Sequence, residues 1–210
     1  MDIYPVGGFP LIVELSGRPC VVIGGGAVAE RKVEGLLDAG AAVTVVSPTV
    51  TVALAALART GRIAHVRRRY RRGDLAASEL AFVATGDRDV AAAVAREGRR
   101  RGVWVNAADD PAHCDFFLPS VIRRGRLLVA VATAGASPAL ARAVREDIER
   151  RLVPEYATLT DTVAAVRQEL RAQGRSPDAA AWNRALAETI HDVTVDVTRH
   201  RLLERLGAVS

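Results

Sequence analysis

The residues best suited to chemistry begin with a glycine-rich segment, Gly24 to Ala29, that follows a run of β-branched residues. Its small residues Gly24, Gly26 and Ala29 fit the pattern G-x-G-x-x-G/A, which lets the backbone approach a pyrophosphate at the start of a helix. The segment lies between a predicted strand and a predicted helix, as this mechanism requires. A glycine turn without a nucleotide is the alternative. We predict dinucleotide contacts from Gly24, Gly25, Gly26, Ala27 and Val28.

No acidic residue follows the second predicted strand, where an NAD site usually holds the ribose with a carboxylate. Ser47, Pro48 and Thr49 stand there instead. Their two hydroxyl groups can bind a ribose, but they do not discriminate by charge against a 2′-phosphate. We predict that these three residues contact the cofactor, while the residues alone leave the choice between NAD and NADP open.

A second candidate group, Asn106 to Pro111, comes directly after the fifth predicted strand. Open α/β sheets bind ligands at the carboxyl ends of their strands, so Asp109 is expected at the ligand-binding edge with Asp110 beside it. A carboxylate in that place suits a general base. The sequence Asp-Asp-Pro is also a common turn, so an ordinary loop is the alternative.

A third candidate is the small-residue loop from Thr133 to Ser137, which leads into a predicted helix. Ser137 as the N-cap and Pro138 at the first helical position predict a helix start whose N–H groups can bind a carboxylate. Arg142 and Arg145 follow within two turns. Simple helix capping with solvated arginines is the alternative.

These candidates need an α/β framework, and the hydrophobic pattern predicts one. Strands are expected over 18–23, 43–46, 63–67, 80–84 and 103–106, alternating with helices over 27–39, 50–60 and 89–101. Such alternation is typical of βαβ units and a mostly parallel sheet. Strands over 116–122 and 127–132, joined by the turn 123–125, then predict a hairpin, and helices are expected from Ser137 onward, with a break at 174–177.

Composition excludes several classes of protein. The chain has 210 residues, half of them hydrophobic, and its net charge of +5 comes almost wholly from arginine, because Lys32 is the only lysine. No apolar run approaches the roughly 20 residues that cross a bilayer, and the N-terminus lacks signal-peptide features. Cys20 and Cys114 cannot form a disulfide framework. We expect a cytoplasmic protein with no membrane partner.

The arginine-rich run over 67–72 suggests nucleic acid at first sight. It lies beside a predicted edge strand, where charge commonly prevents aggregation. Because no nucleic-acid-binding motif accompanies it, a solvated sheet edge is the better interpretation. We therefore expect no nucleic-acid partner, and steeply salt-dependent binding to duplex DNA would contradict this.

Taken in order, several motifs make residues 2–153 resemble the precorrin-2 dehydrogenase and sirohydrochlorin ferrochelatase family, the N-terminal module of sirohaem synthases. Each motif is common alone, but the ordered set at these spacings is specific. The motifs are Tyr4-Pro5, Gly24 to Lys32, Val45 to Pro48, Ala84 to Asp87, Val105 to Pro111, Cys114 to Ser120, and Ser137 to Arg142.

This resemblance implies NAD-dependent oxidation of precorrin-2 to sirohydrochlorin, and some family members also insert ferrous iron as a substrate. It implies that Asp109 is the catalytic base or the metal-handling group. His113 is a second metal candidate because it is close to Asp109 in the sequence, and an ordinary loop histidine is the alternative. Thr85 and Asn106 join the predicted cofactor contacts. Thr133 falls where the family has an active-site serine, and Ala134 replaces a glycine, which is expected to stiffen that loop.

The resemblance also implies a homodimer. We expect an α/β protein with a Rossmann-type parallel sheet in residues 1–113, a small α+β dimerisation domain in 114–150 and a helical C-terminal domain in 151–210. Since about 60 residues follow residue 150, we expect another protein to perform the methyl transfer of fused synthases.

The expected substrate is a polycarboxylate, which an arginine-rich cleft beside the catalytic carboxylate would suit. The predicted substrate contacts are Ser120, Arg123, Arg124, Thr133, Ser137, Arg142 and Arg145. A non-catalytic dinucleotide sensor is the alternative function. Bound cofactor without turnover of precorrin-2 would favour the sensor.

Overall fold

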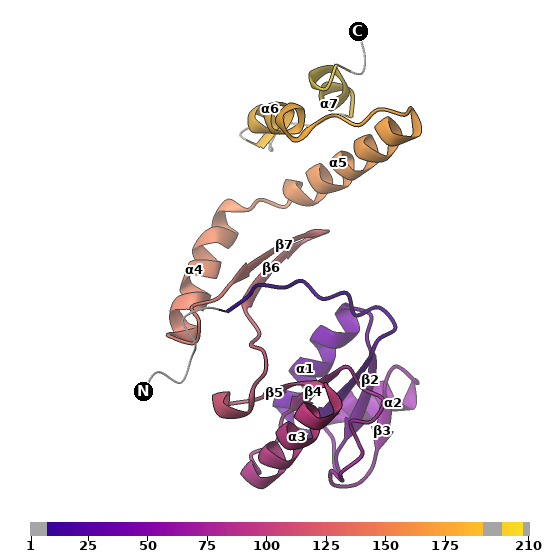
Figure 1. The fold of residues 1–210 in the computed structure, drawn as a ribbon, viewed down its shortest axis with the longest axis vertical. Coiled ribbons are helices and arrows are strands. Elements are labelled where there is room, and N and C mark those ends of the chain that lie inside the picture. The colour runs from indigo at the N-terminus through magenta and orange to yellow at the C-terminus, as the bar shows by residue number, and fades with distance from the viewer. Residues whose placement is uncertain (1–7, 191–198, 208–210) are drawn as a thin grey trace. The chain divides into compact units, whose positions relative to one another are not determined.

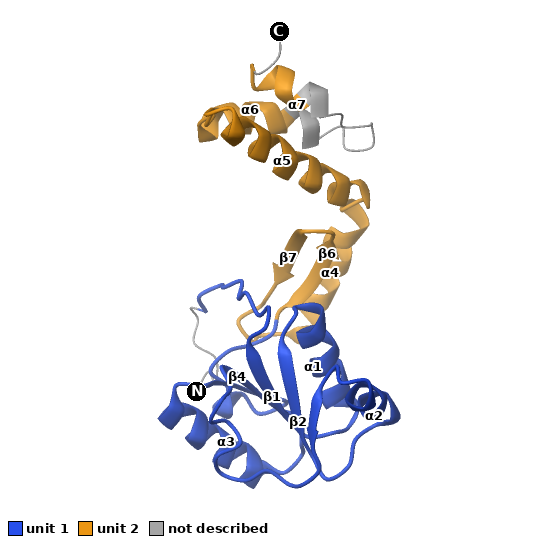
Figure 2. Cartoon of the chain, turned by 90° about the vertical axis from the view of Figure 1, so that its right-hand side faces the viewer, with its two compact units in different colours: residues 1–118 blue, residues 119–210 orange. Residues whose placement is uncertain are grey.

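The computed structural model describes residues 8–190 and 199–207, so the Tyr4-Pro5 motif lies outside the described residues. The chain divides into two compact units, residues 1–118 and residues 119–210 (Figure 2). The first unit is a parallel sheet with helices, and the second contains a hairpin and helices (Figure 1). The three-domain division predicted from the sequence stays a prediction.

The sheet of the first unit has the strand order β3-β2-β1-β4-β5, and every neighbouring pair is parallel. This confirms the predicted Rossmann-type α/β fold. The order reverses between β1 and β4, so the carboxyl ends of these two strands form the switch point where open sheets bind ligands. The strands are β1 (Pro19–Ile23), β2 (Ala42–Val46), β3 (Ala64–Val66), β4 (Leu80–Val83) and β5 (Trp104–Ala107).

Three helices follow strands of this sheet: α1 (Ala27–Asp38), α2 (Val52–Arg59) and α3 (Arg88–Arg101). Alternate residues of β1 enter two separate cores, because Val22 packs with α1 and α2 residues whereas Val21 packs with α3 residues. A sheet covered on both faces needs strands that are apolar throughout, which is the pattern the sequence shows.

Some element boundaries differ from the sequence prediction, and local hydrogen bonds explain them. Helix α2 begins at Val52, because the Thr51 side chain accepts a hydrogen bond from the Leu54 N–H at 3.2 Å and is the N-cap. Strand β3 ends at Val66, because the Arg68 N–H turns back to the Val66 carbonyl at 2.8 Å. A short 3-10 helix, η1 (Pro111–His113), was not predicted.

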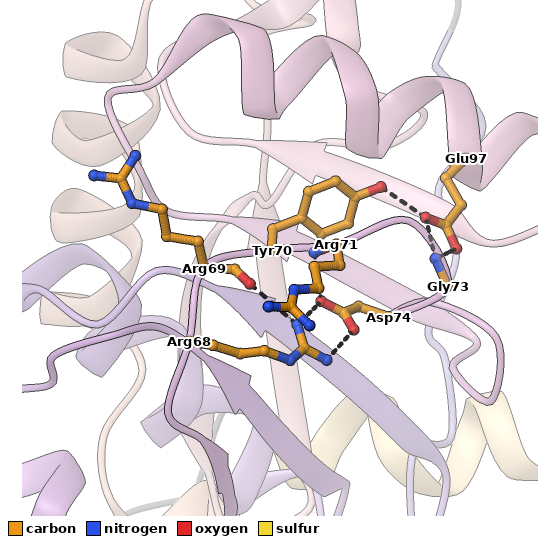
Figure 3. Close-up of polar contacts among 7 residues, drawn as sticks. All are labelled: Arg68, Arg69, Tyr70, Arg71, Gly73, Asp74 and Glu97. Atoms are coloured by element: carbon orange, nitrogen blue, oxygen red, sulfur yellow. Dashed lines mark hydrogen bonds and ion pairs between the residues drawn. The ribbon is translucent and has the colours of Figure 1, made fainter.

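The arginine-rich run follows the edge strand β3 as a loop, and Figure 3 shows that part of it is anchored. Arg68 donates two hydrogen bonds to Asp74, at 2.8 and 2.7 Å, and the Tyr70 hydroxyl donates to Glu97 at 2.6 Å. Glu97 is only 1% exposed. The arginines at 67, 69, 71 and 72 are exposed, so the prediction of a solvated edge is right for them and wrong for Arg68 and Tyr70.

The second unit begins with an antiparallel hairpin of β6 (Ser120–Arg124) and β7 (Leu127–Val131). The expected first strand, 116–122, was placed too early, and the expected turn was wrong. Arg124 pairs with Leu127, so Gly125 and Arg126 form the two-residue loop. Gly125 has a φ of 55°, which suits the first central position of a hairpin turn.

After the hairpin, the described residues of the second unit contain the helices α4 (Pro138–Arg151), α5 (Glu155–Ala172), α6 (Ala179–Ile190) and α7 (Arg199–Arg205). The Ser137 side chain caps α4, as predicted, by accepting a hydrogen bond from the Leu140 N–H at 3.1 Å. Val166 and Leu170 of α5 share a buried cluster with Leu202 of α7. None of the described helices is long and apolar enough to span a membrane.

Candidate active site

The glycine turn lies at the switch point of the sheet, directly after β1. Gly24 has a φ of 125°, and a Cβ built on it would lie 2.3 Å from the carbonyl oxygen of Ala84, at the end of β4. Gly25 is also enclosed, since a Cβ there would lie 2.0 Å from the Thr49 carbonyl oxygen. These contacts explain why both positions lack a side chain. The turn brings together the ends of β1, β2 and β4.

Gly26 is different, because its surroundings are open. It is the N-cap of α1, no side chain caps that end of the helix, and a Cβ would meet nothing within 4 Å. The first turn of α1 therefore presents backbone N–H groups beside exposed Gly26 and Ala27. A helix N-terminus of this kind binds phosphate groups, so the residues present fit the pyrophosphate of a dinucleotide.

The loop after β2 contains the predicted ribose contacts. Ser47 is 7% exposed, and its hydroxyl donates to the Thr49 carbonyl at 2.7 Å, so it holds the loop. Pro48 and Thr49 are exposed. After β4, Thr85 is partly buried, and its hydroxyl accepts a hydrogen bond from the Asp87 N–H at 3.3 Å. Their predicted contacts with the cofactor stay predictions.

A carboxylate from helix α1 lies beside the loop that follows β2. The Thr51 hydroxyl donates to Glu30 of α1 at 2.5 Å, and the Thr51 N–H donates to the Gly25 carbonyl at 2.9 Å. Glu30 therefore places a negative charge beside the loop that follows β2. The sequence does not indicate this pairing, because Glu30 and Thr51 are 21 residues apart.

A cavity of about 450 Å³ opens in the first unit, between the start of α1 and the segment after β5. Val28, from the predicted cofactor contacts, lies on the α1 side, and Asp109 lies on the other. The structure thus brings residues from the first and second candidate groups to one cavity. The full lining is Val28, Arg31, Lys32, Asn106, Ala107, Ala108, Asp109, Asp110, Pro111, Cys114, Phe117 and Leu118.

Asp109 lies in a strained turn directly after the carboxyl end of β5. Its φ is 58°, a left-handed conformation that residues other than glycine seldom adopt, and its side chain is exposed. Strain of this kind is often found at functional sites. Among the described residues, none donates a hydrogen bond to its carboxylate. Asp109 is therefore available to a ligand in the cavity.

The neighbours of Asp109 hold the segment in place. Asp110 accepts a hydrogen bond from His113 Nδ1 at 2.7 Å, so His113 is oriented by Asp110. Asn106 is 6% exposed, and its amide donates to the Phe116 carbonyl at 2.9 Å. Among the described residues, no group of three His, Cys, Asp or Glu side chains could hold a metal ion. The predicted cofactor role of Asn106 and metal role of His113 stay predictions.

Cys114 and Phe116 complete this support. The Ala107 N–H donates to Cys114 Sγ at 3.2 Å, and burial raises the pKa of the Cys114 thiol. The Phe116 ring meets Phe82 of β4 edge to face, with centroids 5.5 Å apart. These contacts explain why residues 116–119 do not belong to the hairpin. They fix one wall of the cavity against the sheet.

Lys32 is one of the cavity residues that were not predicted as site residues from the sequence. Its Nζ lies 5.9 Å from the ring centroid of Phe82, and the side chain is half-buried. Burial lowers the pKa of Lys32, nearby Arg31 lowers it further, and Cys114 and Asp109 oppose this shift. The signal was present in the spacing, because positions 28, 31 and 32 share one face of a helix.

The loop residues predicted to bind substrate lie in the second unit. Thr133 Oγ1 donates to the Ser137 carbonyl at 3.0 Å and accepts from the Ser137 N–H at 3.1 Å, which closes the loop. Ala134 has a left-handed φ of 48°. Ser120 is the first residue of β6. Substrate contacts of these residues stay predictions.

The four predicted substrate arginines divide into two pairs. Arg124 and Arg145 both form ion pairs with Glu149 of α4, and Arg145 also pairs with Glu146, so two carboxylates offset the two guanidinium groups within the unit. Arg123 and Arg142 are exposed, and no described residue forms an ion pair with them. The structure therefore favours Arg123 and Arg142 over the other two as free cations.

Comparisons with known proteins agree with this geometry. Residues 11–120 match a family described as "Putative NAD(P)-binding", and residues 124–151 match one described as "Sirohaem biosynthesis protein central". The siroheme synthase of Methylococcus capsulatus is 41% identical over 84% of this chain and 38% of that protein. The siroheme synthase of Methylobacillus flagellatus is 41% identical over 77% of this chain and 35% of that protein.

A solved structure extends the similarity along the chain. SirC, a precorrin-2 dehydrogenase, matches with a TM-score of 0.76 and 27% identity over 96% of this chain and 100% of that chain. The chain spans less than two fifths of the length of the two siroheme synthases. The first family match covers more than half of the residues and includes the glycine turn and the cavity. The chain therefore belongs to this NAD(P)-binding family, with relatives named siroheme synthase and precorrin-2 dehydrogenase, as its sequence motifs indicated.

Proposed function

We propose that this chain oxidises precorrin-2 to sirohydrochlorin with NAD as the hydride acceptor. The observation that carries the proposal is the cavity of about 450 Å³ that joins the start of α1 to Asp109. The similarity to SirC, whose name gives this dehydrogenation, supports the same substrate. The siroheme synthases support the same biosynthetic route.

Different residues of the chain bind the cofactor and accept the proton in this oxidation. The glycine turn and the first turn of α1 bind the pyrophosphate, and NAD supplies a hydride acceptor when bound. The carboxylate of Asp109 accepts the proton that the macrocycle loses together with the hydride. The strained turn and the hydrogen bonds of Asn106 and Asp110 hold this carboxylate at the cavity. Catalysis is then mainly the positioning of reacting groups.

Glu30 supports NAD over NADP. Its carboxylate accepts a hydrogen bond from the Thr51 hydroxyl beside the loop after β2, which is where such folds hold the adenosine ribose. A negative charge at that place would repel the 2′-phosphate of NADP. No lysine or arginine stands in residues 47–51 to offset it.

Ferrous iron is proposed as a second substrate, to be inserted into sirohydrochlorin at the same cavity. Asp109 is exposed there, and its carboxylate can take a proton from the macrocycle as the metal enters. His113 belongs to the segment that follows Asp109, and its Nδ1 is hydrogen-bonded to the Asp110 carboxylate at 2.7 Å. We assign the proton-accepting role to Asp109 and a supporting role to His113.

A cytoplasmic homodimer that uses precorrin-2 and sirohydrochlorin completes the proposal. Large apolar side chains remain exposed on the second unit, at Val121 of β6 (38%) and at Leu140 (54%) and Val144 (39%) of α4. Leu140 and Val144 are four residues apart and share one helix face. A second copy of the chain covering these side chains would remove them from water.

The experiment that tests the function supplies purified protein with precorrin-2 and NAD under anaerobic conditions, and then with ferrous or cobaltous ion. Formation of sirohydrochlorin together with NADH is the expected first result, followed by the metallated macrocycle. Tight NAD binding without sirohydrochlorin would contradict the proposal and favour the dinucleotide sensor. Oxidation without metal insertion would overturn only the proposed use of iron.

A further inference from the structure

Lys32 differs from every other basic residue in the chain. It is the only lysine among 29 lysine and arginine residues, and it lies on the wall of the cavity that contains Asp109. Among the lysine and arginine side chains, Lys32 is therefore the only ammonium group, and all the others are guanidinium groups. A lysine is a point charge that can meet a single carboxylate oxygen, unlike the planar fork of arginine.

The ammonium group of Lys32 lies over an aromatic ring, but no described residue forms a hydrogen bond or ion pair with it. The side chain is half-buried above the Phe82 ring, with its Nζ 5.9 Å from the centroid. Asp109 and Cys114 act on the ammonium group only through longer-range charge. A partly desolvated cation of this kind is stabilised when an anion enters the cavity.

The position of Lys32 along α1 separates it from the expected pyrophosphate. It follows the N-cap Gly26 by six residues, which places it about 9 Å further along the helix. Its neighbours on the cavity wall include the exposed Arg31 and the apolar side chains of Phe117 and Leu118, which are 48% and 51% exposed. A wall that combines apolar side chains with the cations of Lys32 and Arg31 suits a flat ring that carries acidic side chains.

We infer that Lys32 determines substrate specificity by binding a carboxylate of the tetrapyrrole in this cavity. The inference rests on the proposed function for the identity of the substrate, and it adds an anchoring role to a residue outside the glycine turn. Lys32 binds and orients the ring, while Asp109 carries out the proton transfer. Lys32 is thus a binding residue, and its loss weakens substrate affinity.

The single lysine makes a direct test possible in the full chain. Reductive methylation with ¹³C-formaldehyde labels only Lys32 and the α-amino group, and it keeps the positive charge. The pKa of dimethylated Lys32 is then followed by NMR in the free protein, with NAD, with sirohydrochlorin, and with a polycarboxylate porphyrin or its methyl ester. We expect both polycarboxylates to raise this pKa, and NAD and the methyl ester to leave it unchanged.

Two results of this titration overturn the inference. If NAD alone raises the pKa of Lys32, then the lysine binds the cofactor phosphates. If neither polycarboxylate changes the pKa, then Lys32 does not bind the substrate.

Steady-state kinetics give a second readout. We expect Lys32→Gln to raise the KM for precorrin-2 about tenfold, with little change in kcat or in the KM for NAD, because one charge-assisted contact is lost. Lys32→Arg keeps the charge and should recover part of the loss. Arg59→Gln, in the exposed last turn of α2, is the matched control and should behave as wild type.

The two proposals fail in different ways. If wild type does not oxidise precorrin-2, the proposed function fails, but the NMR titration with the polycarboxylate porphyrin still decides what Lys32 binds. If wild type oxidises precorrin-2 and Lys32→Gln leaves its KM unchanged, the role of Lys32 fails alone.

Discussion

Gly24 and Ala84 meet where the strand order of the sheet reverses, and the space between them admits no side chain. A Cβ on Gly24 would lie 2.3 Å from the Ala84 carbonyl oxygen. Gly26, two residues on, has nothing within 4 Å of the same position. One glycine therefore serves the packing of the turn, and the other leaves room for a ligand.

This contrast predicts different outcomes for two alanine substitutions. Gly24→Ala forces a backbone contact and a strained φ of 125°, and we expect it to lower the free energy of unfolding by about 3 kcal/mol or more. Gly26→Ala should leave that free energy within about 0.5 kcal/mol of wild type but weaken NAD binding at least tenfold. Urea unfolding and calorimetric titration with NAD measure the two effects. Unimpaired NAD binding by Gly26→Ala would place the pyrophosphate elsewhere.

Glu30 predicts the choice of cofactor. We expect wild type to bind NAD more tightly than NADP, and Glu30→Gln to narrow this preference about fivefold, because roughly 1 kcal/mol of charge repulsion is removed. Glutamine can still accept the Thr51 hydrogen bond, so the loop should keep its conformation. Glu34→Gln, on the exposed side of α1, is the control. An unchanged ratio of the two dissociation constants in Glu30→Gln would exclude this role.

The buried carboxylate in Figure 3 predicts how stability depends on pH. Burial acts to raise the pKa of Glu97, but hydrogen bonds from Tyr70, from the Gly73 N–H and from Arg101 outweigh it, so the pKa is lowered. The hydrogen bond from Arg68 lowers the pKa of Asp74 in the same loop. Each group therefore binds fewer protons in the folded state than in the unfolded chain.

This difference in proton binding makes the protein less stable at acid pH. The stabilisation is complete above the unfolded pKa of about 4 to 4.5, and it is lost as the pH falls through the lower folded values. We expect a constant free energy of unfolding from pH 7 to about 5.5 and a steady fall toward pH 3. Glu97→Gln should cost about 2 kcal/mol at pH 7 and show a shallower acid fall. The free energies of unfolding are measured in urea at each pH. If they fall equally steeply with decreasing pH in wild type and Glu97→Gln, this account is contradicted.

Ala134 predicts a stabilising substitution. Its φ of 48° is strained for alanine and natural for glycine, so Ala134→Gly should raise the free energy of unfolding by up to about 1 kcal/mol. The control is Ala136→Gly in the same loop, where φ is not positive; we expect it to lower that free energy by about 0.5–1 kcal/mol. Equal destabilisation by both substitutions would show that Ala134 is not strained.

The sequence best predicts the features that follow from the local pattern of apolar residues and glycines. The βαβ pattern predicted the parallel sheet, and the glycines predicted a turn at the carboxyl end of β1. Asp109 was placed at the same edge, because carboxyl ends of parallel strands share one side of a sheet. Each of these inferences needs only residues that are close together in the chain.

The remaining features depend on contacts between distant residues. Tyr70 and Glu97 are 27 positions apart, and no local pattern pairs them. The start of β6 was placed too early, because the apolar run at 116–118 looks like a strand, whereas Phe116 packs against Phe82. Lys32 was passed over as one cation in an arginine-rich chain, although its helix position relative to Val28 could have indicated it.

The central claim is that Asp109 accepts the proton removed from the substrate, and Asp109→Asn tests it most directly. Asparagine tolerates the left-handed φ of 58° at this turn, so the fold and NAD affinity should be retained. We predict that single-turnover formation of sirohydrochlorin from precorrin-2 with saturating NAD slows by about a hundredfold or more. Turnover close to that of wild type, with NAD bound normally, would contradict the account.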